Sequence, residues 1–480
     1  MRIAVTIVLL VASTLATALS VSILPYYDDK ADGVQPLMVF TLLLWMLFAG
    51  TLLSLRRVPT RAAVALVIAG SVAIGGAAMM GPPNTSTDSA RYAWDGIVQN
   101  AGISPYEYVP ADPVLAPLRT EWLFPTPTPD ADAAGGARCP GERVMKVKEL
   151  GTGEVLCTTI NRATVPTIYP PMSEIFFAGI RALAGDGPQY WPSQLAGLIM
   201  SLGITGILLH TLTRLGRDPR WAAMWGFSPL AATEGVTNSH VDLLGALLLL
   251  VATVLVASGR RFSGGLALGA SIASKLIPVI GAPALLGKRP FRIILASIAI
   301  FLLLYVPYIL ASGIGVLGYL PGYLGEEGYG SGKRFVLLSL VAPGQWGLLL
   351  AAVLVGITGL LVWRKTDPAN PWVGQVVMIG VTLLVVTPRY AWYALLLVPF
   401  IAMSGRWEWL AVPLALTERL LVGDTTLARI TIAVAIMFIL VVTLRRAGPG
   451  AFGRGASGVL RRYRRIRAVL GTRSIPASRA

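Results

Sequence analysis

Long apolar runs separated by short polar or basic segments extend along nearly the whole chain. Three runs open the sequence, at about residues 3–24, 36–55 and 62–80, and each is long enough to cross a hydrocarbon core of roughly 30 Å. Backbone polar groups in lipid need partners within the protein, so such runs predict transmembrane helices. Comparable runs follow at about 190–213, 241–258, 291–311, 343–363, 372–387 and 427–444. The pattern therefore predicts an all-α polytopic membrane protein.

Shorter apolar segments predict helices that cover only part of the membrane. They lie at about residues 221–233, 392–404 and 408–422. Residues 262–287 carry Lys275 in their middle and basic clusters on both sides. Two half-length helices that meet near Ser274–Pro278 satisfy both flanks, and Pro278 favours the break. We expect about 12 to 14 transmembrane or half-membrane helices within residues 1–444.

Basic residues indicate the orientation of these helices, because arginine and lysine concentrate in cytoplasmic loops. Arg56, Arg57 and Arg61 follow the second apolar run, and three more arginines lie at 214–220. With both ends of the helical part inside, residues 81–188 form one large extracytoplasmic loop. This orientation is that of a multi-pass protein of the plasma membrane.

The large loop shows elements of its own. Residues 88–102 have the periodicity of an amphipathic helix, with Tyr92 and Ile97 on roughly one face. Residues 143–160 alternate around a glycine turn, which predicts a small β-hairpin. Residues 168–185 begin with prolines suited to a helix start and predict a second amphipathic helix.

The composition agrees with a membrane protein, since 55% of the residues are hydrophobic and 13% are charged. Soluble proteins average about 25% charged residues. The net charge of +16 reflects in part ten arginines in the last 36 residues, where no acid occurs. Residues 445–480 therefore predict a basic cytoplasmic tail on anionic lipid. The tail lacks the interleaved aromatic residues of nucleic-acid binders, so we expect no nucleic-acid partner.

The chain has two cysteines, Cys139 and Cys157, and both fall in the large loop. A pair confined to one extracytoplasmic loop predicts a disulfide, which needs an oxidising compartment. Closing a loop of this size stabilises it by roughly 3 kcal/mol on the chain-entropy model. Two free thiols are the alternative.

Two acids, Asp88 and Asp95, lie among Arg91, Tyr92 and other aromatic residues at the start of the large loop. Aromatic rings stack on sugar faces, and carboxylates bind hydroxyl groups or take a proton. These residues therefore predict a sugar site at the outer mouth of the helices. The alternative is structural, with Asp88 as a helix cap and Asp95 as a solvated acid.

Three further residues are candidates within the apolar part. His240 and Asp242 lie at the outer end of an apolar helix, whereas we interpret His210, the only other histidine, as structural. Lys275 lies inside an apolar segment, where a charge is costly and usually functional, and a phosphate is its natural counter-ion. Snorkelling to the interface is the alternative for Lys275. With His210 interpreted as structural, no second histidine or cysteine offers a zinc partner for His240 outside the disulfide loop, so we expect no metal.

Basic residues of the later outer loops could extend an anion site. Lys333 and Arg334 follow a glycine-rich segment, and Arg389 stands beside Tyr390 in an aromatic cluster. Plain loop charges and an interfacial aromatic belt explain the same residues. No G-x-G-x-x-G motif or P-loop is present, and we expect no cofactor.

In the order of its motifs, the sequence resembles the integral-membrane GT-C glycosyltransferases that use polyprenyl-phosphate sugars. It is most similar to glycosyltransferase family 87 and the related actinobacterial mannosyltransferases. The motifs are DSARYAWDGIVQNAGISPYEY (88–108), INRATVPTIYPP (160–171, with Tyr169), TNSHVD (237–242), SKLIP (274–278) and TPRYAWYALLLVPF (387–400). In the last motif the family often has a histidine before the Trp-Tyr pair, where this chain has Tyr390 and Ala391.

The resemblance implies a GT-C fold and specific residue roles. Asp88 matches the general base of the first large loop, and Lys275 matches the residue that meets the donor phosphate. His240 and Asp242 would line the cleft, with Arg91, Tyr92, Asp95, Tyr169, Arg389 and Tyr390 as further substrate contacts. The implied activity is inverting transfer of a sugar, most often mannose, from a polyprenyl-phosphate donor to a cell-envelope glycolipid or lipoglycan.

Other functions stay open at this stage. Arabinofuranosyl transfer from the corresponding lipid phosphate is the nearest variant, and a ligase that joins preassembled glycans is another. A transporter or flippase of a lipid-linked glycan is a different class. Transporters usually show inverted repeats and acids at the membrane midplane. Here the candidate acids lie in a large outer loop, which favours an enzyme.

Overall fold

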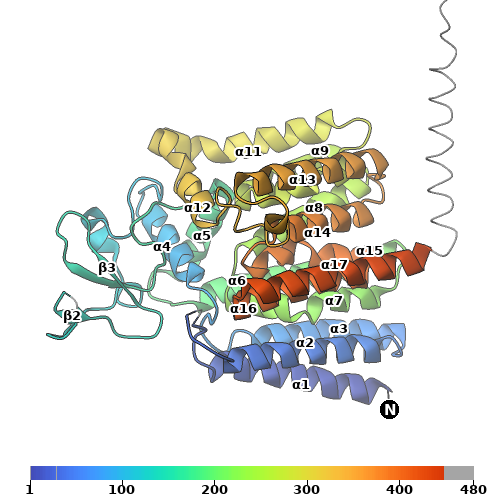
Figure 1. Cartoon of the computed structure of the whole chain (residues 1–480), viewed down its shortest axis with the longest axis horizontal. Coiled ribbons are helices and arrows are strands. Elements are labelled where there is room, and N and C mark those ends of the chain that lie inside the picture. The colour runs from blue at the N-terminus through green and yellow to red at the C-terminus, as the bar shows by residue number, and fades with distance from the viewer. Residues whose placement is uncertain (1, 29, 134, 448–480) are drawn as a thin grey trace, which may run out of the picture.

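The computed structural model describes residues 2–28, 30–133 and 135–447. Its helices lie roughly side by side in one bundle, and a smaller layer of short helices and strands covers one end (Figure 1). The bundle begins with α1 (Arg2–Ser22), α2 (Pro36–Leu55) and α3 (Thr60–Ala77) and ends with α17 (Thr425–Ala447). The predicted tail from residue 448 onward lies outside the described residues.

Seven helical segments of the described chain are long and apolar enough to cross a membrane. The prediction of a polytopic helical protein is confirmed, whereas the expected number of 12 to 14 helices stays a prediction. The seven segments are Arg2–Ser22, Pro36–Leu55, Thr60–Ala77, Trp191–Arg214, Phe291–Glu326, Gln345–Lys365 and Thr425–Ala447. An eighth crossing is added if η3 (Ala231–Thr237) and α8 (Asp242–Ala257), which meet at 113°, form one broken span.

Shorter helices fill the interior between these segments. The predicted half-length helices around Lys275 are present as α9 (Arg261–Lys275), followed by η4 (Ile277–Gly281) and α10 (Pro283–Leu286). The break falls at Leu276, whose φ is +57°, two residues before Pro278. The other helices of the bundle, both long and short, are α6 (Trp191–Arg214), η2 (Pro219–Ala222), α7 (Ala223–Gly226), α11 (Phe291–Ser312), η5 (Gly313–Leu317), α12 (Leu320–Glu326), η6 (Leu338–Leu340), α13 (Gln345–Lys365), α14 (Trp372–Val386), η7 (Ala391–Leu396), α15 (Val398–Ser404), η8 (Trp407–Leu410) and α16 (Ala411–Val422).

The buried core lies where these helices meet, and large apolar side chains cover the outside of the bundle. Leu302, Leu303 and Leu310 of α11 are more than half exposed. Such a surface is stable only when apolar material covers it, as lipid does in a membrane. Glycines allow the closest approach of the first helices, and a Cβ at Gly81 would lie 1.8 Å from the carbonyl oxygen of Val21.

The outer layer contains the two predicted amphipathic helices, α4 (Asp88–Asn100) and α5 (Pro171–Ala184). The predicted hairpin is also present, and β3 (Met145–Lys148) pairs antiparallel with β4 (Val155–Thr158). Between these elements lie η1 (Pro113–Leu118) and a second small pair, β1 (Thr128–Pro129) with β2 (Ala137–Arg138). A disulfide joins Cys139 to Cys157, as predicted.

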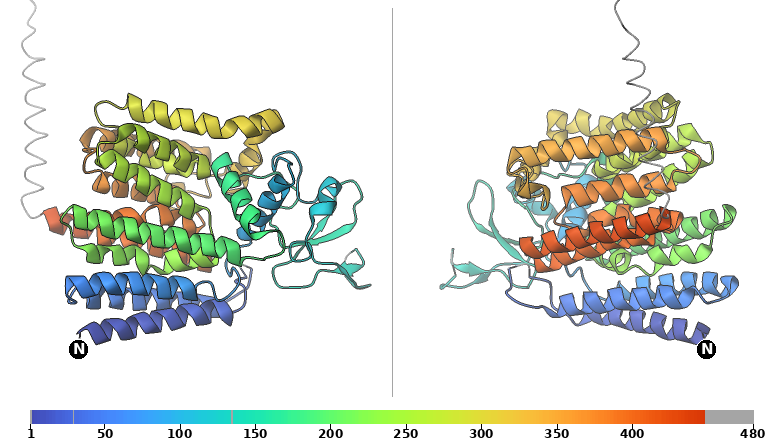
Figure 2. Two further views of the ribbon diagram at one scale, coloured as in Figure 1. Left: turned by 180° about the vertical axis from the view of Figure 1, so that it is seen from behind. Right: turned by 45° about the vertical axis from the view of Figure 1, so that its right-hand side comes forward.

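The two ends of the bundle differ in what they carry. The N-terminus of α1 and the last turn of α17, with Arg445 and Arg446, lie at one end, and the outer layer lies at the other (Figure 2). This arrangement agrees with the orientation that the basic residues predict. The outer layer is therefore the part that the prediction places outside the cell.

Candidate functional site

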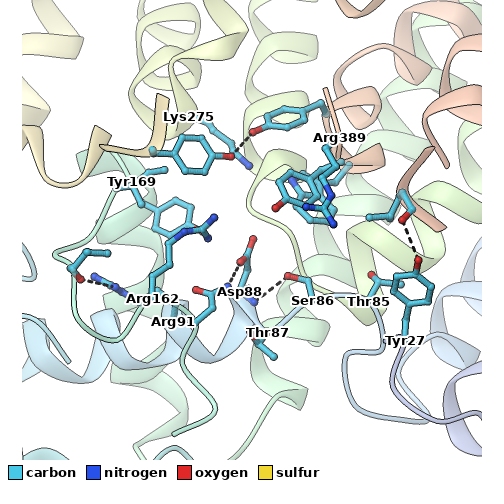
Figure 3. A pocket seen from close by; sticks show the side chains of 18 of the residues that line it. Tyr27, Thr85, Ser86, Thr87, Asp88, Arg91, Arg162, Tyr169, Lys275 and Arg389 are labelled. Carbon is cyan, nitrogen blue, oxygen red and sulfur yellow. Dashed lines mark hydrogen bonds between the residues drawn. The ribbon is translucent and has the colours of Figure 1, made fainter. Parts of the chain in front are cut away.

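A cavity of about 1030 Å³ lies where the outer layer meets the helical bundle (Figure 3). Segments from almost the whole chain line it, from the α1–α2 loop to α16. Among the described residues, its charged lining consists of three acids and six cations: Asp28, Asp88, Glu142, Lys30, Arg91, Arg162, Lys275, Arg334 and Arg389. The cavity is at the upper end of the size range of ligand pockets.

Asp88 opens α4 and points into the cavity near its middle (Figure 3). Its backbone N–H donates to the Ser86 hydroxyl at 3.1 Å, which fixes the first turn of α4. The Asn161 amide donates to one oxygen of the Asp88 carboxylate, and His240 Nδ1 lies 3.5 Å from the other oxygen. Asp88 forms no side-chain cap, so its predicted structural alternative does not describe its contacts.

The environment keeps Asp88 ionised. Burial alone raises the pKa of Asp88, but contact with His240 and its charge, together with Lys275 and Asn161, outweigh burial and lower the pKa to about 2. The carboxylate is therefore charged at every physiological pH. A charged carboxylate in a cavity is able to accept a proton or to bind a hydroxyl group.

His240 lies behind Asp88 and is not among the described residues that line the cavity. Its side chain is fully buried, and its Nε2 lies 3.3 Å from an oxygen of Glu234. The Trp392 ring stacks on the imidazole with 3.7 Å between ring centroids, and Tyr390 stacks on Trp392 at 4.3 Å. The imidazole thus has one carboxylate on each side and an aromatic ring on its face.

Cations occupy the part of the cavity that faces the bundle. Lys275, the last residue of α9, forms an ion pair with Asp242 and lies 4.9 Å above the ring of Tyr393. Arg334 forms an ion pair with Glu327 and is 5% exposed. Lys275 and Arg334 line the cavity, whereas the described lining does not include their acidic partners. An anion in the cavity would therefore meet the cationic sides of both pairs.

Arg91 lines the cavity one helical turn after Asp88, and its Nε donates to Asp95 at 2.8 Å. Asp95 is 1% exposed, so the alternative of a solvated acid is wrong. It lies outside the described cavity lining and close to Glu174, which accepts hydrogen bonds from Thr167 and Gln99. Asp95 thus contacts protein groups, and a substrate contact stays a prediction.

Asp95 and Glu174 form a buried acid pair. Burial raises the pKa of Asp95, although the positive charge of Arg91 opposes the shift. Burial and the negative charge of Asp95 raise the pKa of Glu174 well above its usual value. One arginine faces two acids, so the pair retains a proton that a solvated pair would lose.

The predicted aromatic and outer basic residues lie around the same cavity. Tyr169 lines it, and the buried Tyr92 packs beside it with 5.0 Å between the ring centroids. Arg389 and Tyr390 line the opposite region. Arg162, which the sequence did not single out, pairs with Glu326 at 2.8 Å and lies over the ring of Tyr323 at 5.4 Å.

Unfavourable backbone conformations gather at this site. The described residues other than glycine with positive φ are Arg162, Ser239, Leu276 and Thr387. Arg162 and Leu276 line the cavity, and Ser239 precedes His240. Thr387 accepts a hydrogen bond from the backbone of Val336 and donates one to the carbonyl of Arg334. Such strain persists only where surrounding contacts enforce it, as at functional sites.

Three polar residues of the site escaped the sequence analysis: Asn161, Glu174 and Glu234. Glu174 and Glu234 stand in apolar segments, and an acid in such a segment was the available signal. Asn161 lies in the motif at 160–171, but no role was predicted for it, because only the fold brings it to Asp88. No group of three or more His, Cys, Asp or Glu side chains in the described ranges has the arrangement to hold a metal ion.

Residues 167–388 match the model of glycosyltransferase family 87. No curated protein and no solved structure matches the chain. Because this family consists of sugar-transferring enzymes, the match supports a transferase activity for this chain. The matched segment is slightly less than half of the chain; it contains Glu234, His240, Asp242 and Lys275, and it excludes Asp88 and Arg389. The role of Asp88 therefore depends on the cavity geometry.

Proposed function

We propose that the protein transfers mannose from a polyprenyl-phosphate donor to a cell-envelope glycolipid or lipoglycan on the extracytoplasmic face. The observation that carries the proposal is one cavity that is lined by a charged carboxylate, Asp88, and by the cations Lys275 and Arg334. The cavity lies at the end of the bundle that the basic residues predict to be outside. A lipid-linked donor presents its phosphate at such a level.

The donor phosphate is expected on the side of Lys275 and Arg334. Both cations already face the cavity from fixed ion pairs, so little reorganisation is needed to bind an anion. Apolar side chains line the cavity beside them: Ile168, Leu276, Ile277, Leu320, Leu324 and Leu420. They provide a surface for the first isoprene units of the lipid.

The reaction is a displacement at the anomeric carbon. The acceptor oxygen forms a bond to this carbon while the bond to the phosphate oxygen breaks, and the phosphate leaves with the electron pair. Asp88 takes the proton of the acceptor hydroxyl. Because attack and departure occur on opposite faces, the base and the phosphate-binding cations must lie on different sides of the sugar. We therefore expect the sugar to lie between Asp88 and Lys275, which are separate side chains around the cavity (Figure 3).

The low pKa of Asp88 makes it a weak base on its own. A donor phosphate changes this, because its negative charge lies in the same cavity and it occupies Lys275. Negative charge near a carboxylate favours its protonated form. Donor binding thus raises the proton affinity of Asp88 when the acceptor is to be deprotonated.

The test is transfer of radiolabelled mannose from synthetic polyprenyl-phosphate-mannose to endogenous acceptors in membranes that express the protein. Asp88→Asn should abolish the labelled product at equal expression. Asp112→Asn is the matched control, since Asp112 lies in the same loop outside the described cavity lining and caps η1. It should transfer label like wild type.

Each other outcome has a defined meaning. Equal transfer by wild type and Asp88→Asn would reject Asp88 as the base. Transfer from polyprenyl-phosphate-arabinose, with none from the mannose donor, would show that the transferred sugar is arabinose and would leave the proposed mechanism unchanged. Absence of transfer from both donors in detergent, where transport has no meaning, would favour the transporter.

A further inference from the structure

Glu234 is the one acid in contact with His240 other than Asp88 among the described ion pairs. We propose that Glu234 is a positioning residue of the reaction, holding His240 as an imidazolium so that Asp88 can become neutral during proton transfer. The inference rests on the proposed function of Asp88 as the base. Glu234 is then a residue that the reaction requires although it does not contact the substrate.

The contacts of Glu234 fix His240 from two directions. The His240 backbone N–H donates to the Glu234 carbonyl oxygen at 3.0 Å, and the imidazole Nε2 lies 3.3 Å from the Glu234 carboxylate. The Thr85 hydroxyl donates to both carboxylate oxygens, at 3.4 and 3.3 Å. Glu234 is 4% exposed, so its charge is compensated within the protein.

The backbone is built to bring these groups together. Glu234 lies in the π-helix η3, an uncommon element that frequently occurs at functional sites. After η3 the chain bends by 113° into α8, and Ser239 in this bend has a φ of +54°. The Asn238 amide oxygen accepts hydrogen bonds from the backbone N–H groups of Asn84 and Thr85, which lie four and three residues before α4. The bend with His240 and the start of α4 with Asp88 therefore form one unit.

The surroundings of His240 favour a charged imidazole. Its two nitrogens face Asp88 and Glu234, and Trp392 covers its ring. The neighbouring charges on α8 and α9, Asp242 and Lys275, form an ion pair with each other and add little net charge. A buried imidazole between two carboxylates is most stable with both ring nitrogens protonated.

Glu234 matters at the moment when Asp88 accepts the acceptor proton. Asp88 then loses its charge, and an imidazolium with no other partner would be a buried unpaired cation, which is costly. The Glu234 carboxylate remains beside His240 and keeps the charge paired. Proton transfer therefore costs less with Glu234 present, whereas binding of the donor phosphate at Lys275 does not involve Glu234.

The kinetics of Glu234→Gln test whether Glu234 affects proton transfer without affecting donor binding. We expect transfer at saturating donor to fall on the order of 10- to 100-fold, with the KM for polyprenyl-phosphate-mannose within about twofold of wild type. The matched control is Glu408→Gln, another buried glutamate, which pairs with Arg446 at 2.9 Å near the opposite end of the bundle. It should retain the wild-type rate. An unchanged rate for a folded Glu234→Gln protein would overturn the proposal.

A second measurement is independent of activity. The chain has two histidines, so His210→Gln leaves His240 as the only histidine, and ¹⁵N-histidine NMR in detergent reports its charge directly. We expect a doubly protonated ring at pH 7, and loss of the second ring proton at a lower pH in the variant that also carries Glu234→Gln than in the variant that retains Glu234. A neutral His240 ring at pH 7 in the His210→Gln variant that retains Glu234 would overturn the proposal.

The two measurements separate the inference from the proposed function. If no donor transfers label to wild-type membranes, the proposed function fails, while the NMR result still decides the charge of His240. If wild type is active and Glu234→Gln raises the KM and lowers the melting temperature together, Glu234 is a structural residue and the inference fails alone.

Discussion

Two buried acids of the outer layer, Asp88 and Glu174, have pKa values that differ from those of solvated acids. Asp88 and Glu174 lie in neighbouring helices of the outer layer, α4 and α5, yet their pKa values shift in opposite directions. Contact with His240 outweighs burial at Asp88, whereas burial and the charge of Asp95 act together at Glu174. The balance between burial and the neighbouring charges therefore sets the direction of each pKa shift.

The raised pKa of Glu174 predicts a pH dependence of stability. Its pKa is raised in the folded state from an ordinary value of 4.5, so the folded protein binds more protons than the unfolded one above pH 4.5. Stability should fall as pH rises from 4.5 through the folded pKa, by up to about 1.4 kcal/mol per pH unit. Thermal unfolding in detergent between pH 5 and 8 measures this slope.

Glu174→Gln should reduce the slope, because glutamine has the shape of the protonated acid and does not ionise. Glu154→Gln, at an exposed position next to the hairpin turn, is the control and should follow wild type. Parallel curves for wild type and Glu174→Gln would show that Glu174 is already ionised at pH 5.

The ion pair of Lys275 and Asp242 predicts a separation of stability from activity. Lys275→Met leaves Asp242 buried without its partner and should cost about 3 to 5 kcal/mol. Lys275→Met with Asp242→Asn removes both charges and should recover most of this stability but no transfer activity. Melting temperatures and label transfer of the same preparations measure the two effects.

The ion pair of the exposed Asp218 with the partly buried Arg220 provides the control for this experiment. Asp218→Asn should cost less than about 1 kcal/mol and leave transfer unchanged. Full activity in the double variant of Lys275 and Asp242 would remove Lys275 from the proposed phosphate site.

At the residue scale, sequence alone identified the residues that are unusual for their segment. Asp88, His240 and Lys275 stand out as polar residues beside or within apolar runs, and the structure places them around one cavity or directly behind it. The sequence left the partners undetermined, because pairings such as Asn161 with Asp88 join residues 73 positions apart. No local pattern encodes such a contact.

At the element scale, the outer layer depends on the disulfide of Cys139 and Cys157. The two cysteines are 18 positions apart in the sequence. A disulfide that closes a loop of roughly this length stabilises the folded state by about 3 kcal/mol. Cys157 is fully buried, and Thr158 next to it donates to the Leu123 carbonyl at 2.9 Å. Asn161, the partner of Asp88, follows four residues after Cys157.

Reduction of the disulfide should therefore loosen the segment and weaken transfer while the helical bundle persists. We expect faster tryptic cleavage near Arg138 and several-fold lower transfer after treatment with dithiothreitol. Cys139→Ser with Cys157→Ser should show the same cleavage without reductant and no further response to it. Equal protease resistance with and without the bond would contradict the prediction.

The helices were easier to predict than the breaks between them. The predicted span at 36–55 coincides with α2, and the span at 241–258 differs from α8 by one residue at each end. Length and hydropathy suffice for such elements. The π-helix η3 and the bend at Ser239 were not predicted, because tertiary contacts, such as the Gln194 amide with the Thr237 carbonyl at 2.9 Å, hold them in place.

At the scale of the whole molecule, the site and the basic helix ends occupy opposite ends of the bundle. Arg56 and Arg57 follow α2, and Arg445 and Arg446 lie in the last turn of α17, whereas the cavity lies under α4 and α5. The same polarity that predicts the orientation of the helices in the membrane therefore also predicts the side on which the reaction takes place. A site outside the cell has no access to nucleotide sugars, which is why the orientation bears on the donor.

Labelling of introduced cysteines tests this polarity. Thr152→Cys, exposed in the hairpin turn, should react with a membrane-impermeant maleimide in intact cells, and Ser258→Cys, exposed between α8 and α9, should react only after permeabilisation. Both are made in the Cys139→Ser, Cys157→Ser background, which itself should not label. The reverse pattern would place the cavity in the cytoplasm, where nucleotide sugars are available. A lipid-phosphate donor would then no longer be required, and the cations Lys275 and Arg334 would be expected to bind the diphosphate of a nucleotide sugar.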